Sequence, residues 1–428
     1  MEQALALVLA CVLLLCEVSF AQSASVQTHS IPSGYRNVWI LGGHDKLSAY
    51  DGNSFQLLQE STLPRPTEDF GQPEPFSISH DGLVLYANSN GGHFFWNLWR
   101  AGRLYKLLGD TTITRPGTGD TSHVIDATPY PRLAADSQQL FWFENWLSVL
   151  RQGNGIELRQ SGEFRGWVSG LDNRNLGKTA EFPFASCKCD TSVCEETCPR
   201  VDAWAPVTGI TDFFFLTLWV PGQTSPRFLE TDLYQATGGV WKKSRLEAPV
   251  NEFLDASDHG NSYIARTFDT ACCGWENESD DVTYVVHDGR RVTLFDEFGR
   301  FENKDYDISF FTPKALFSPD GANIAYEISA TSYAPDAKIR LADEGKKNPD
   351  ELLRIRQALS GLPRVEVVRS ADLAKPIFSL PKAELVGWLD RDRLLIWRHG
   401  ELLAINTTKW QFKATGLKAD RATRVFVR

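Results

Sequence analysis

The sequence predicts an all-β fold made of repeated antiparallel sheets, and three observations lead to this prediction. A hairpin signal recurs along the chain, few segments have the apolar spacing of a long helix, and Phe, Trp and Tyr make up 12% of the residues. Aromatic side chains suit pleated surfaces that pack against one another. With 428 residues, 42% of them hydrophobic, the chain is long enough to bury a large core.

The best preserved copy of the hairpin signal is FSPDGANIAYEIS, residues 317–329. Asp320 can bind its own backbone and Gly321 tolerates a positive φ, so the pair predicts a tight turn. Pro319 fixes φ just before that turn. The apolar residues at 324–326 then predict a strand that is buried on both faces.

Five further stretches repeat this signal in weaker form. SHDGLVLYA (79–87) matches without a gap and places Asp81 and Gly82 at the turn. AADSQQLFW (134–142) places Asp136 there. The remaining copies are SDHGNSYIA (257–265), ITDFFFLTLWV (210–220) and GWLDRDRLLIW (387–397).

The spacing of the copies predicts the architecture. Successive turns lie 55, 76, 47, 61 and 71 residues apart, which suits one four-stranded sheet plus loops. Repeated four-stranded units are typical of β-propeller blades. Three short strand candidates at 38–59 and the terminal TRVFVR (423–428) predict one more sheet, which closes the ring. The sequence favours a single β-propeller domain over 30–428 with seven four-stranded blades; six or eight blades are the alternatives.

The phrase FSPDGANIAY (317–326) resembles the WD40-like repeat of TolB-type β-propellers, which include periplasmic and secreted proteins. The resemblance implies a propeller that binds proteins, or in some relatives saccharides or peptides, on its loop faces or at its channel mouth. It transfers no catalytic residue, because the motif consists of turn and core positions. The chain departs from TolB in that its strand-rich pattern begins soon after the leader, without a preceding α/β domain.

The N-terminus predicts export. ALALVLACVLLLC (4–16) is apolar but short for a membrane span, and a small-x-small pattern follows it. We interpret residues 1–21 as a secretory signal peptide cleaved after Ala21, with Ala24 as an alternative site. An uncleaved anchor is a further alternative, because the segment before the apolar run has Glu2 and no Lys or Arg. The mature chain is expected in the periplasm of a bacterium or outside the cell, without a membrane span.

Cysteine usage agrees with export, because an even number of cysteines outside the leader predicts three disulfides. Four of them lie in the polar insert ASCKCDTSVCEETCPR (185–200) and two are adjacent in ACCG (271–274). Zinc is the alternative, but this spacing does not match familiar zinc fingers. We expect no metal and no other cofactor. The six residues are Cys187, Cys189, Cys194, Cys198, Cys272 and Cys273.

A second insert, at 341–364, predicts a short helix over 348–361. Asn348 is suited to the N-cap and Pro349 to the first helical position. The apolar positions 352, 355 and 359 recur at helical spacing, so we expect one helix face to dock on the propeller. The alternative is a helix that binds a partner.

The functional prediction is a non-catalytic binding protein. The net charge of −10 disfavours nucleic acid as a partner, because phosphate neutralisation needs a cationic surface. Motifs of hydrolases, zinc proteases and nucleotide-binding proteins are not found, and no residue is assigned as catalytic. We expect a monomer that binds a protein or a cell-envelope component. The alternative is a saccharide-acting hydrolase or lyase with carboxylates at the channel mouth, to which HFFWNLWR (93–100) could add a stacking surface.

Overall fold

The computed structural model confirms the all-β prediction. It describes residues 36–42, 45–64, 74–78, 83–90, 93–100, 103–109, 111–116, 121–133, 139–152, 157–170, 180–182, 186–188, 200–206, 213–219, 229–237, 240–245, 252–257, 262–267, 282–287, 290–296, 308–332, 349–418 and 424–427. Nearly all of the regular structure in these ranges is antiparallel strand.

The two ends of the described chain share one sheet, which we call the closing sheet. Its strands are β1 (Val38–Leu41), β2 (Lys46–Tyr50), β3 (Leu57–Thr62) and β31 (Arg424–Val427), in the order β3-β2-β1-β31. β1 pairs with β31 in antiparallel register, with Val38 opposite Val427. The predicted closure of the ring by a C-terminal strand is therefore confirmed.

Three sheets follow in chain order. The second sheet contains β4 (Glu74–Ile78), β5 (Val84–Asn90), β6 (His93–Arg100) and β7 (Arg103–Gly109). The third contains β8 (Thr111–Pro116), β9 (Thr121–Leu133), β10 (Gln139–Gln152), β11 (Glu157–Gly170), β12 (Ala180–Phe182) and β13 (Ser186–Lys188). The fourth contains β14 (Arg200–Pro206), β15 (Phe213–Trp219), β16 (Leu229–Thr237) and β17 (Val240–Arg245).

The remaining three sheets hold the second half of the chain. The fifth contains β18 (Glu252–Ala256), β19 (Ser262–Thr267), β20 (Val282–His287) and β21 (Arg290–Asp296). The sixth contains β22 (Ile308–Phe311), β23 (Ala315–Phe317), β24 (Asn323–Ser332), β25 (Arg364–Arg369) and β26 (Phe378–Pro381). The seventh contains β27 (Glu384–Trp388), β28 (Arg393–Arg398), β29 (Glu401–Asn406) and β30 (Gln411–Lys418).

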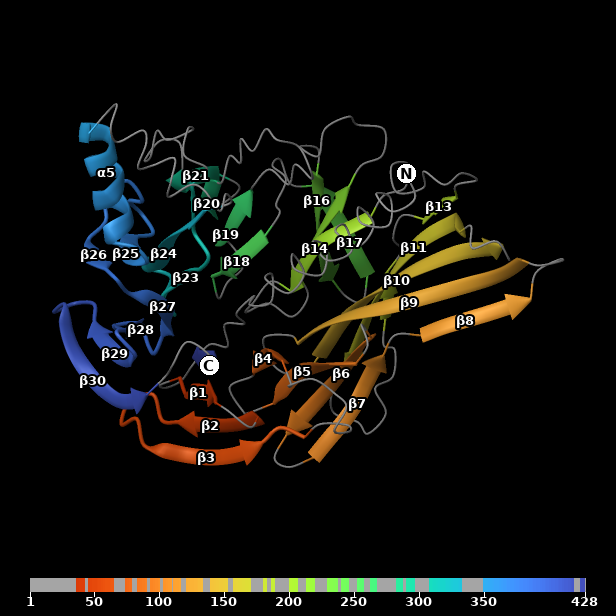
Figure 1. Cartoon of the computed structure of the whole chain (residues 1–428), viewed down its shortest axis with the longest axis horizontal. Helices are drawn as coiled ribbons and strands as arrows, with labels where there is room; N and C mark the ends of the chain where they lie inside the picture. The colour runs from red at the N-terminus through yellow and green to blue at the C-terminus, as the bar shows by residue number, and fades with distance from the viewer. Residues whose placement is uncertain are drawn as a thin grey trace.

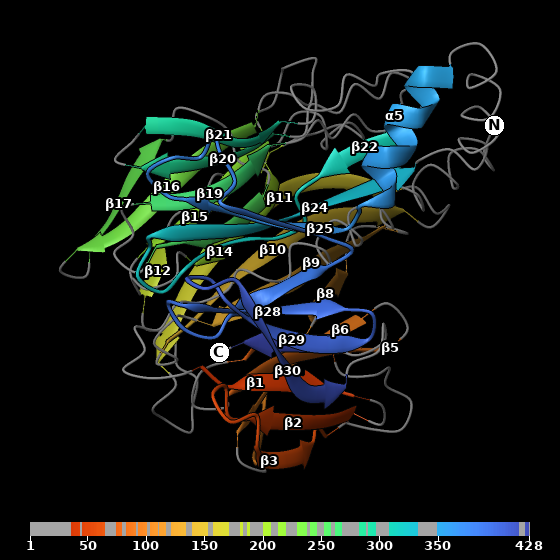
Figure 2. The ribbon, with the colours of Figure 1, turned by 90° about the vertical axis from the view of Figure 1, so that its left-hand side faces the viewer.

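The sheets follow one another around a ring, which is the arrangement of a β-propeller (Figure 1). Successive sheets contact each other through a few strands: β14 contacts β18, β18 contacts β23, β23 contacts β27, and β27 contacts β31. Figure 2 shows the seventh sheet between β24 and β25 on one side and the closing sheet on the other. Counting each sheet as one blade gives seven blades, and that count remains our interpretation.

Each of the six predicted hairpins falls between two strands that pair. The turns of SHDGLVLYA, AADSQQLFW and ITDFFFLTLWV lie between β4 and β5, β9 and β10, and β14 and β15. Those of SDHGNSYIA, FSPDGANIAY and GWLDRDRLLIW lie between β18 and β19, β23 and β24, and β27 and β28. The turn residues Asp81, Gly82 and Asp136 themselves lie outside the described residues.

The core consists of apolar layers between neighbouring sheets. One layer joins the fifth and sixth sheets, a second joins the sixth and seventh, and a third joins the seventh and closing sheets. A fourth layer joins the closing and second sheets and contains Trp99. Trp96 and Trp99 of HFFWNLWR are both buried, which favours core packing over sugar stacking for these two rings.

Helix α5 (Pro349–Ser360) lies in the connection between β24 and β25. Leu359 packs against the apolar layer between the fifth and sixth sheets, as do Leu362 and Leu373. Leu353 of the same helix is 56% exposed to solvent. Asn348 and the side chains at 352 and 355 lie outside the description. Within the described ranges, no helix combines the length and the apolar character needed to cross a membrane.

Candidate binding surface

Hairpin turns of three sheets lie at one end of the ring and form the surface that we call the turn face. The turn after the first strand of a sheet and the turn after the third strand leave the sheet at the same edge, because the strands alternate in direction. Hydrogen bonds link several of these turns to each other, as described below. The turn face consists of five turns of the closing, sixth and seventh sheets: 51–56, 318–322, 370–377, 389–392 and 407–410.

The turn at 318–322 has the predicted geometry. The Oδ1 atom of Asp320 accepts hydrogen bonds from the backbone N–H of Ala322 (3.1 Å) and from the hydroxyl of Ser318 (2.6 Å). Gly321 has φ +69°, a conformation that favours glycine. The hydroxyl of Ser370 donates to the carbonyl oxygen of Gly321 at 2.6 Å, which joins this turn to the turn at 370–377.

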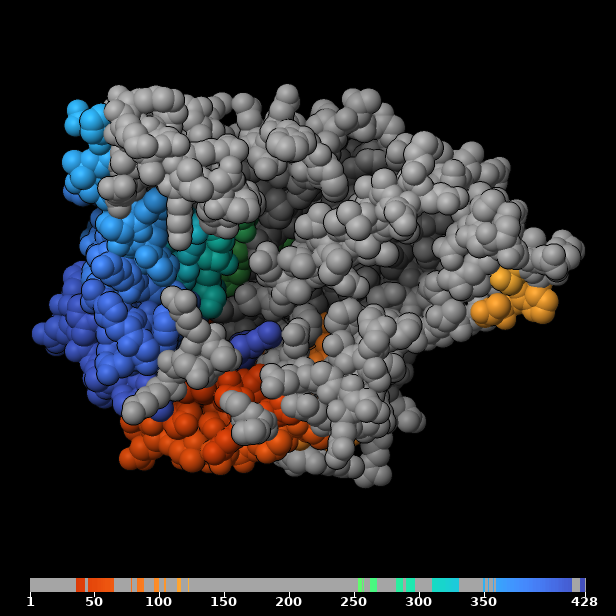
Figure 3. Space-filling model, in the orientation of Figure 1, coloured from red at the N-terminus to blue at the C-terminus, as the bar shows by residue number. Residues whose placement is uncertain are grey.

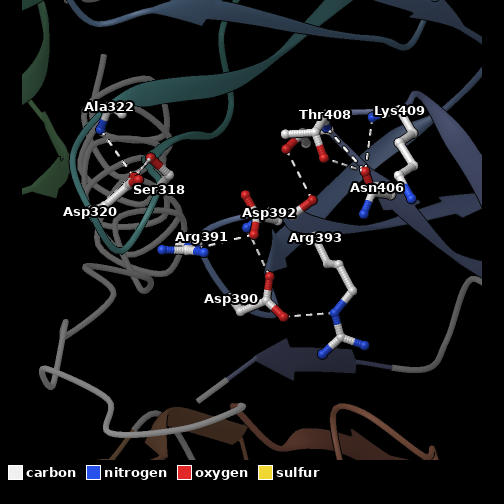
Figure 4. A network of polar contacts seen from close by, with 11 residues as sticks. Ser318, Asp320, Ala322, Asp390, Arg391, Asp392, Arg393, Asn406, Thr408 and Lys409 are labelled. Carbon is white, nitrogen blue, oxygen red and sulfur yellow. Dashed lines mark hydrogen bonds and ion pairs between the residues drawn. The ribbon is translucent and has the colours of Figure 1, made fainter.

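A denser network holds the turn at 389–392 (Figure 4). Asp390 accepts the backbone N–H of Asp392 (2.8 Å) and the guanidinium N–H of Arg393 (2.6 Å). Arg393 also donates to the side chain of Asn53 at 3.2 Å, which joins this turn to the closing sheet. The side chain of Arg391 is 72% exposed and pairs with Asp392 at 3.1 Å.

The turns at 51–56 and 407–410 share a motif that the sequence prediction missed. Asp51 accepts the backbone N–H groups of Asn53 (3.0 Å) and Ser54 (2.6 Å), and the hydrogen bond from Ser54 is the main reason that the pKa of Asp51 is lowered. Asn406 likewise accepts the backbone N–H groups two and three residues later, of Thr408 and Lys409 (3.1 and 2.9 Å). The signal was present in the sequence as DGNSFQ and NTTKWQ. The first contains the pair Asp51-Gly52, which the prediction placed among the strand candidates at 38–59, and the second has no Asp-Gly pair.

Each of these two turns contains an aromatic residue in the left-handed conformation. Phe55 has φ 60° and Trp410 has φ 52°, although bulky residues adopt this region at a cost of about 1–2 kcal/mol. Contacts with the preceding sheet offset the cost: the ammonium of Lys413 lies 5.5 Å from the Phe55 ring, and Trp410 stacks on Phe378 with 4.3 Å between ring centroids. The two rings therefore fill the outer space between neighbouring sheets.

The capping side chains of the turn face are therefore occupied by their own backbone. Asp51, Asp320, Asp390 and Asn406 each accept at least two hydrogen bonds from within the turn or from the next strand. Such groups fix the shape of the surface and are poorly placed to act as an acid, a base or a metal ligand. The exposed side chains between them are the ones available to a partner.

Among the described residues, three carboxylates in the strands are buried, and each has partners within the protein. Asp255 of the fifth sheet accepts the backbone N–H of Phe317 in the sixth sheet at 2.7 Å. Glu366 accepts the hydroxyl of Tyr326 and lies 3.6 Å from the guanidinium of Arg364. Such bonds give the carboxylates a structural role, as expected for buried charged groups.

Glu327 is the third of these carboxylates and joins two sheets. It is 8% exposed, and it accepts the backbone N–H of Leu385 (2.8 Å) in the seventh sheet and the hydroxyl of Ser329 (2.8 Å). Burial raises the pKa of Glu327, while these hydrogen bonds and the charge of Lys314 lower it by less. The carboxylate is therefore held in a position where ionisation is costly.

The raised pKa of Glu327 makes stability depend on pH. The folded chain binds this proton more tightly than the unfolded chain, so the free energy of unfolding should fall as the pH rises from the ordinary pKa of 4.5 through the folded pKa. Glu327→Gln keeps an acceptor for Leu385 but cannot ionise, so its free energy of unfolding should fall less. Urea unfolding of both proteins at about pH 5 and about pH 8 measures the difference. Equal losses in the two proteins would contradict this assignment.

Other residues singled out in the sequence are not placed by the structure. Only Cys187 of the six cysteines lies in a described strand, β13, and its side chain is outside the description. The predicted disulfides therefore stay a prediction. In the part of the chain that is described, no three His, Cys, Asp or Glu side chains gather as metal ligands do.

Comparison with known proteins gives similarity of fold alone. No protein-family model matches the sequence, and no curated protein is similar to it. AztD from Citrobacter koseri is 8% identical, with a TM-score of 0.41 and 92% of this chain and 98% of that chain covered. TolB from Acinetobacter baumannii is 11% identical, with a TM-score of 0.31 and 70% and 61% covered. The protein lmo1340 from Listeria monocytogenes is 7% identical, with a TM-score of 0.40 and 82% and 84% covered.

Proposed function

We propose that this chain is an exported, non-catalytic β-propeller that binds a protein or another cell-envelope component through its turn face. The observation that carries the proposal is the fixed backbone of this surface. Its turns are held by their own Asp and Asn side chains and are joined to each other through Ser370, Arg393 and Thr407. A surface ordered before binding loses less conformational entropy when a partner docks.

Exposed polar side chains stand between the capping residues of the turn face. Arg391 is the most prominent of them, and Thr408 and Lys409 are also exposed. Arginine often contributes strongly to protein interfaces, because its planar group makes several hydrogen bonds and stacks well. The buried carboxylates Asp255, Glu327 and Glu366 are bound to backbone or hydroxyl groups, which favours a structural role for these three over acid–base catalysis.

Arg391→Ala tests this proposal against Lys46→Ala. Both residues are surface cations in an ion pair, but Lys46 lies at the opposite strand ends, where it pairs with Glu60 at 2.7 Å. The immobilised mature chain is exposed to an envelope extract of the source organism, and retained proteins are identified and their affinities measured. We expect binding to weaken about tenfold or more with Arg391→Ala and to be unchanged with Lys46→Ala.

Two results would contradict the proposal. One is a retained partner whose affinity does not change with Arg391→Ala. The other is release of reducing sugar when the purified chain is incubated with envelope polysaccharides, since a binding protein leaves its ligand intact.

A further inference from the structure

A group of apolar side chains lies on the outer edge of the sixth and seventh sheets, where the turns 370–377 and 407–410 of the turn face lead into the last strand of each sheet. We call it the rim patch; it consists of Ile377, Phe378, Trp410 and Phe412. Phe378 stacks on Trp410 with an angle of 2° between the rings, and its centroid lies 6.4 Å from that of Phe412. Ile377 is 40% exposed and Phe412 is 46% exposed. Exposed apolar groups that cluster in this way mark interaction sites.

Phe378 and Phe412 of the rim patch lie on the outermost strands of their sheets, and Ile377 and Trp410 directly precede these strands. β26 ends the order of the sixth sheet and β30 ends that of the seventh. The residues coloured blue in Figure 3, which include both strands, form the left margin of the molecule. A partner therefore reaches this patch from the side of the ring.

All charged residues within the two chain segments that carry the rim patch are lysines, although Asp372 and Glu384 flank the first segment. Segments 373–383 and 407–418 contain five Lys and neither Asp nor Glu, in a chain that has 54 acidic and 44 basic residues. Four of the lysines have exposed side chains in the structure. They are Lys375, Lys382, Lys409 and Lys413.

The whole C-terminal part of the chain is also more basic than the rest of the chain. Residues 364–428 contain 13 Lys and Arg but only 7 Asp and Glu, so this part is positive although the whole chain has a net charge of −10. At physiological salt the Debye length is only about 8 Å, so a partner at the rim patch responds mainly to the lysines beside it. The partner of this patch should therefore be anionic.

We propose that the rim patch is a peripheral contact with an anionic lipid bilayer. Aromatic rings are favoured at the headgroup level, and lysine stems can lie along apolar surface while their ammonium groups reach the phosphates. An anionic bilayer accepts the exposed Phe412 and Ile377 and attracts the lysines at the same time. An anionic polysaccharide would satisfy the lysines, but it would need an open ring face for stacking, and the Phe378 and Trp410 rings cover each other on one side.

Vesicle sedimentation tests the proposal directly. The full mature chain is mixed with vesicles of equal parts phosphatidylglycerol and phosphatidylethanolamine, and separately with phosphatidylcholine vesicles. We expect binding to the anionic vesicles that weakens with added salt, and much weaker binding to phosphatidylcholine. Each of Lys375→Glu and Lys409→Glu should weaken binding about fivefold or more, and Phe412→Ser should weaken it several-fold.

Matched controls are available on β21, the outermost strand of the fifth sheet. Val292 is 49% exposed and Arg290 is also exposed, so Val292→Ser and Arg290→Glu make comparable changes away from the patch. The proposal is wrong if wild-type protein does not sediment with anionic vesicles, or if the control variants reduce sedimentation as much as the patch variants do. Binding to a soluble anionic polysaccharide without binding to vesicles would assign the patch to a saccharide instead. Arg391→Ala should leave vesicle binding unchanged. This variant separates the test from that of the turn face, because Lys375 and Lys409 lie in turns that the two surfaces share.

Discussion

Deletion of residues 419–428, which removes strand β31, is expected to abolish the cooperative unfolding transition of the chain. Val427 is 1% exposed and packs with Val386 and Leu389 of the seventh sheet. Burial of a side chain of this size contributes about 1.5–3 kcal/mol, and the deletion also removes the backbone pairing with β1. Since native domains are stable by only about 5–15 kcal/mol, the total loss should be a large fraction of the stability.

Circular dichroism during thermal unfolding measures this effect. Deletion of Arg428 alone is the control, because it shortens the chain without removing the described part of β31, Arg424–Val427. An intact, cooperative transition in the longer deletion would show that the ring does not depend on its closing strand. A related constraint lies at Gly387, where an added Cβ would come within 3.1 Å of the Val427 side chain.

Trp388→Ala is expected to destabilise the chain by about 3–5 kcal/mol, the usual cost of removing a large buried aromatic ring. Trp388 is 1% exposed and lies in the apolar layer between the sixth and seventh sheets. Its indole N–H also donates to the carbonyl oxygen of Leu316 at 3.1 Å, across the boundary between these sheets. The substitution therefore removes packing and a hydrogen bond at the same interface.

Trp388→Phe separates these two contributions. It keeps most of the ring but leaves the carbonyl oxygen of Leu316 without this donor, so we expect a loss of about 1–3 kcal/mol. Leu353→Ala is a surface control, since Leu353 is 56% exposed and should change the free energy of unfolding by less than about 0.5 kcal/mol. Urea unfolding of the three variants gives the comparison; similar values for Trp388→Ala and Leu353→Ala would exclude a structural role for the indole.

The sequence predicted the hairpins from local signals, and it predicted the closing strand from a sheet that lacked one strand. Asp320 and Gly321 have the residue types that their turn requires, and the buried run at 324–328 matches a strand covered on both faces. The strand at 424–427 could be predicted because the N-terminal strand candidates lacked a fourth member. A few neighbouring residues therefore specify each hairpin, whereas the closing strand is specified by its pairing with β1 near the start of the described chain.

The hydrogen bonds between sheets could not be predicted in the same way. Glu327 binds the backbone of Leu385, 58 residues later, and Asp255 binds that of Phe317, 62 residues later. A carboxylate that caps a distant backbone N–H leaves no pattern in its own neighbourhood. The rim patch was missed for the same reason, since Phe378 and Trp410 meet only when two sheets are placed side by side.

The capped turns also explain why the repeats drift so far in sequence. One Asp or Asn side chain fixes the backbone of each turn, as Asp51 does before Gly52 and as Asn406 does without a following glycine. The positions between such caps are then free to change without altering the path of the chain. The same property would suit the turn face to engineering: new recognition side chains could be grafted at 391, 408 and 409 while the scaffold beneath them stays as it is.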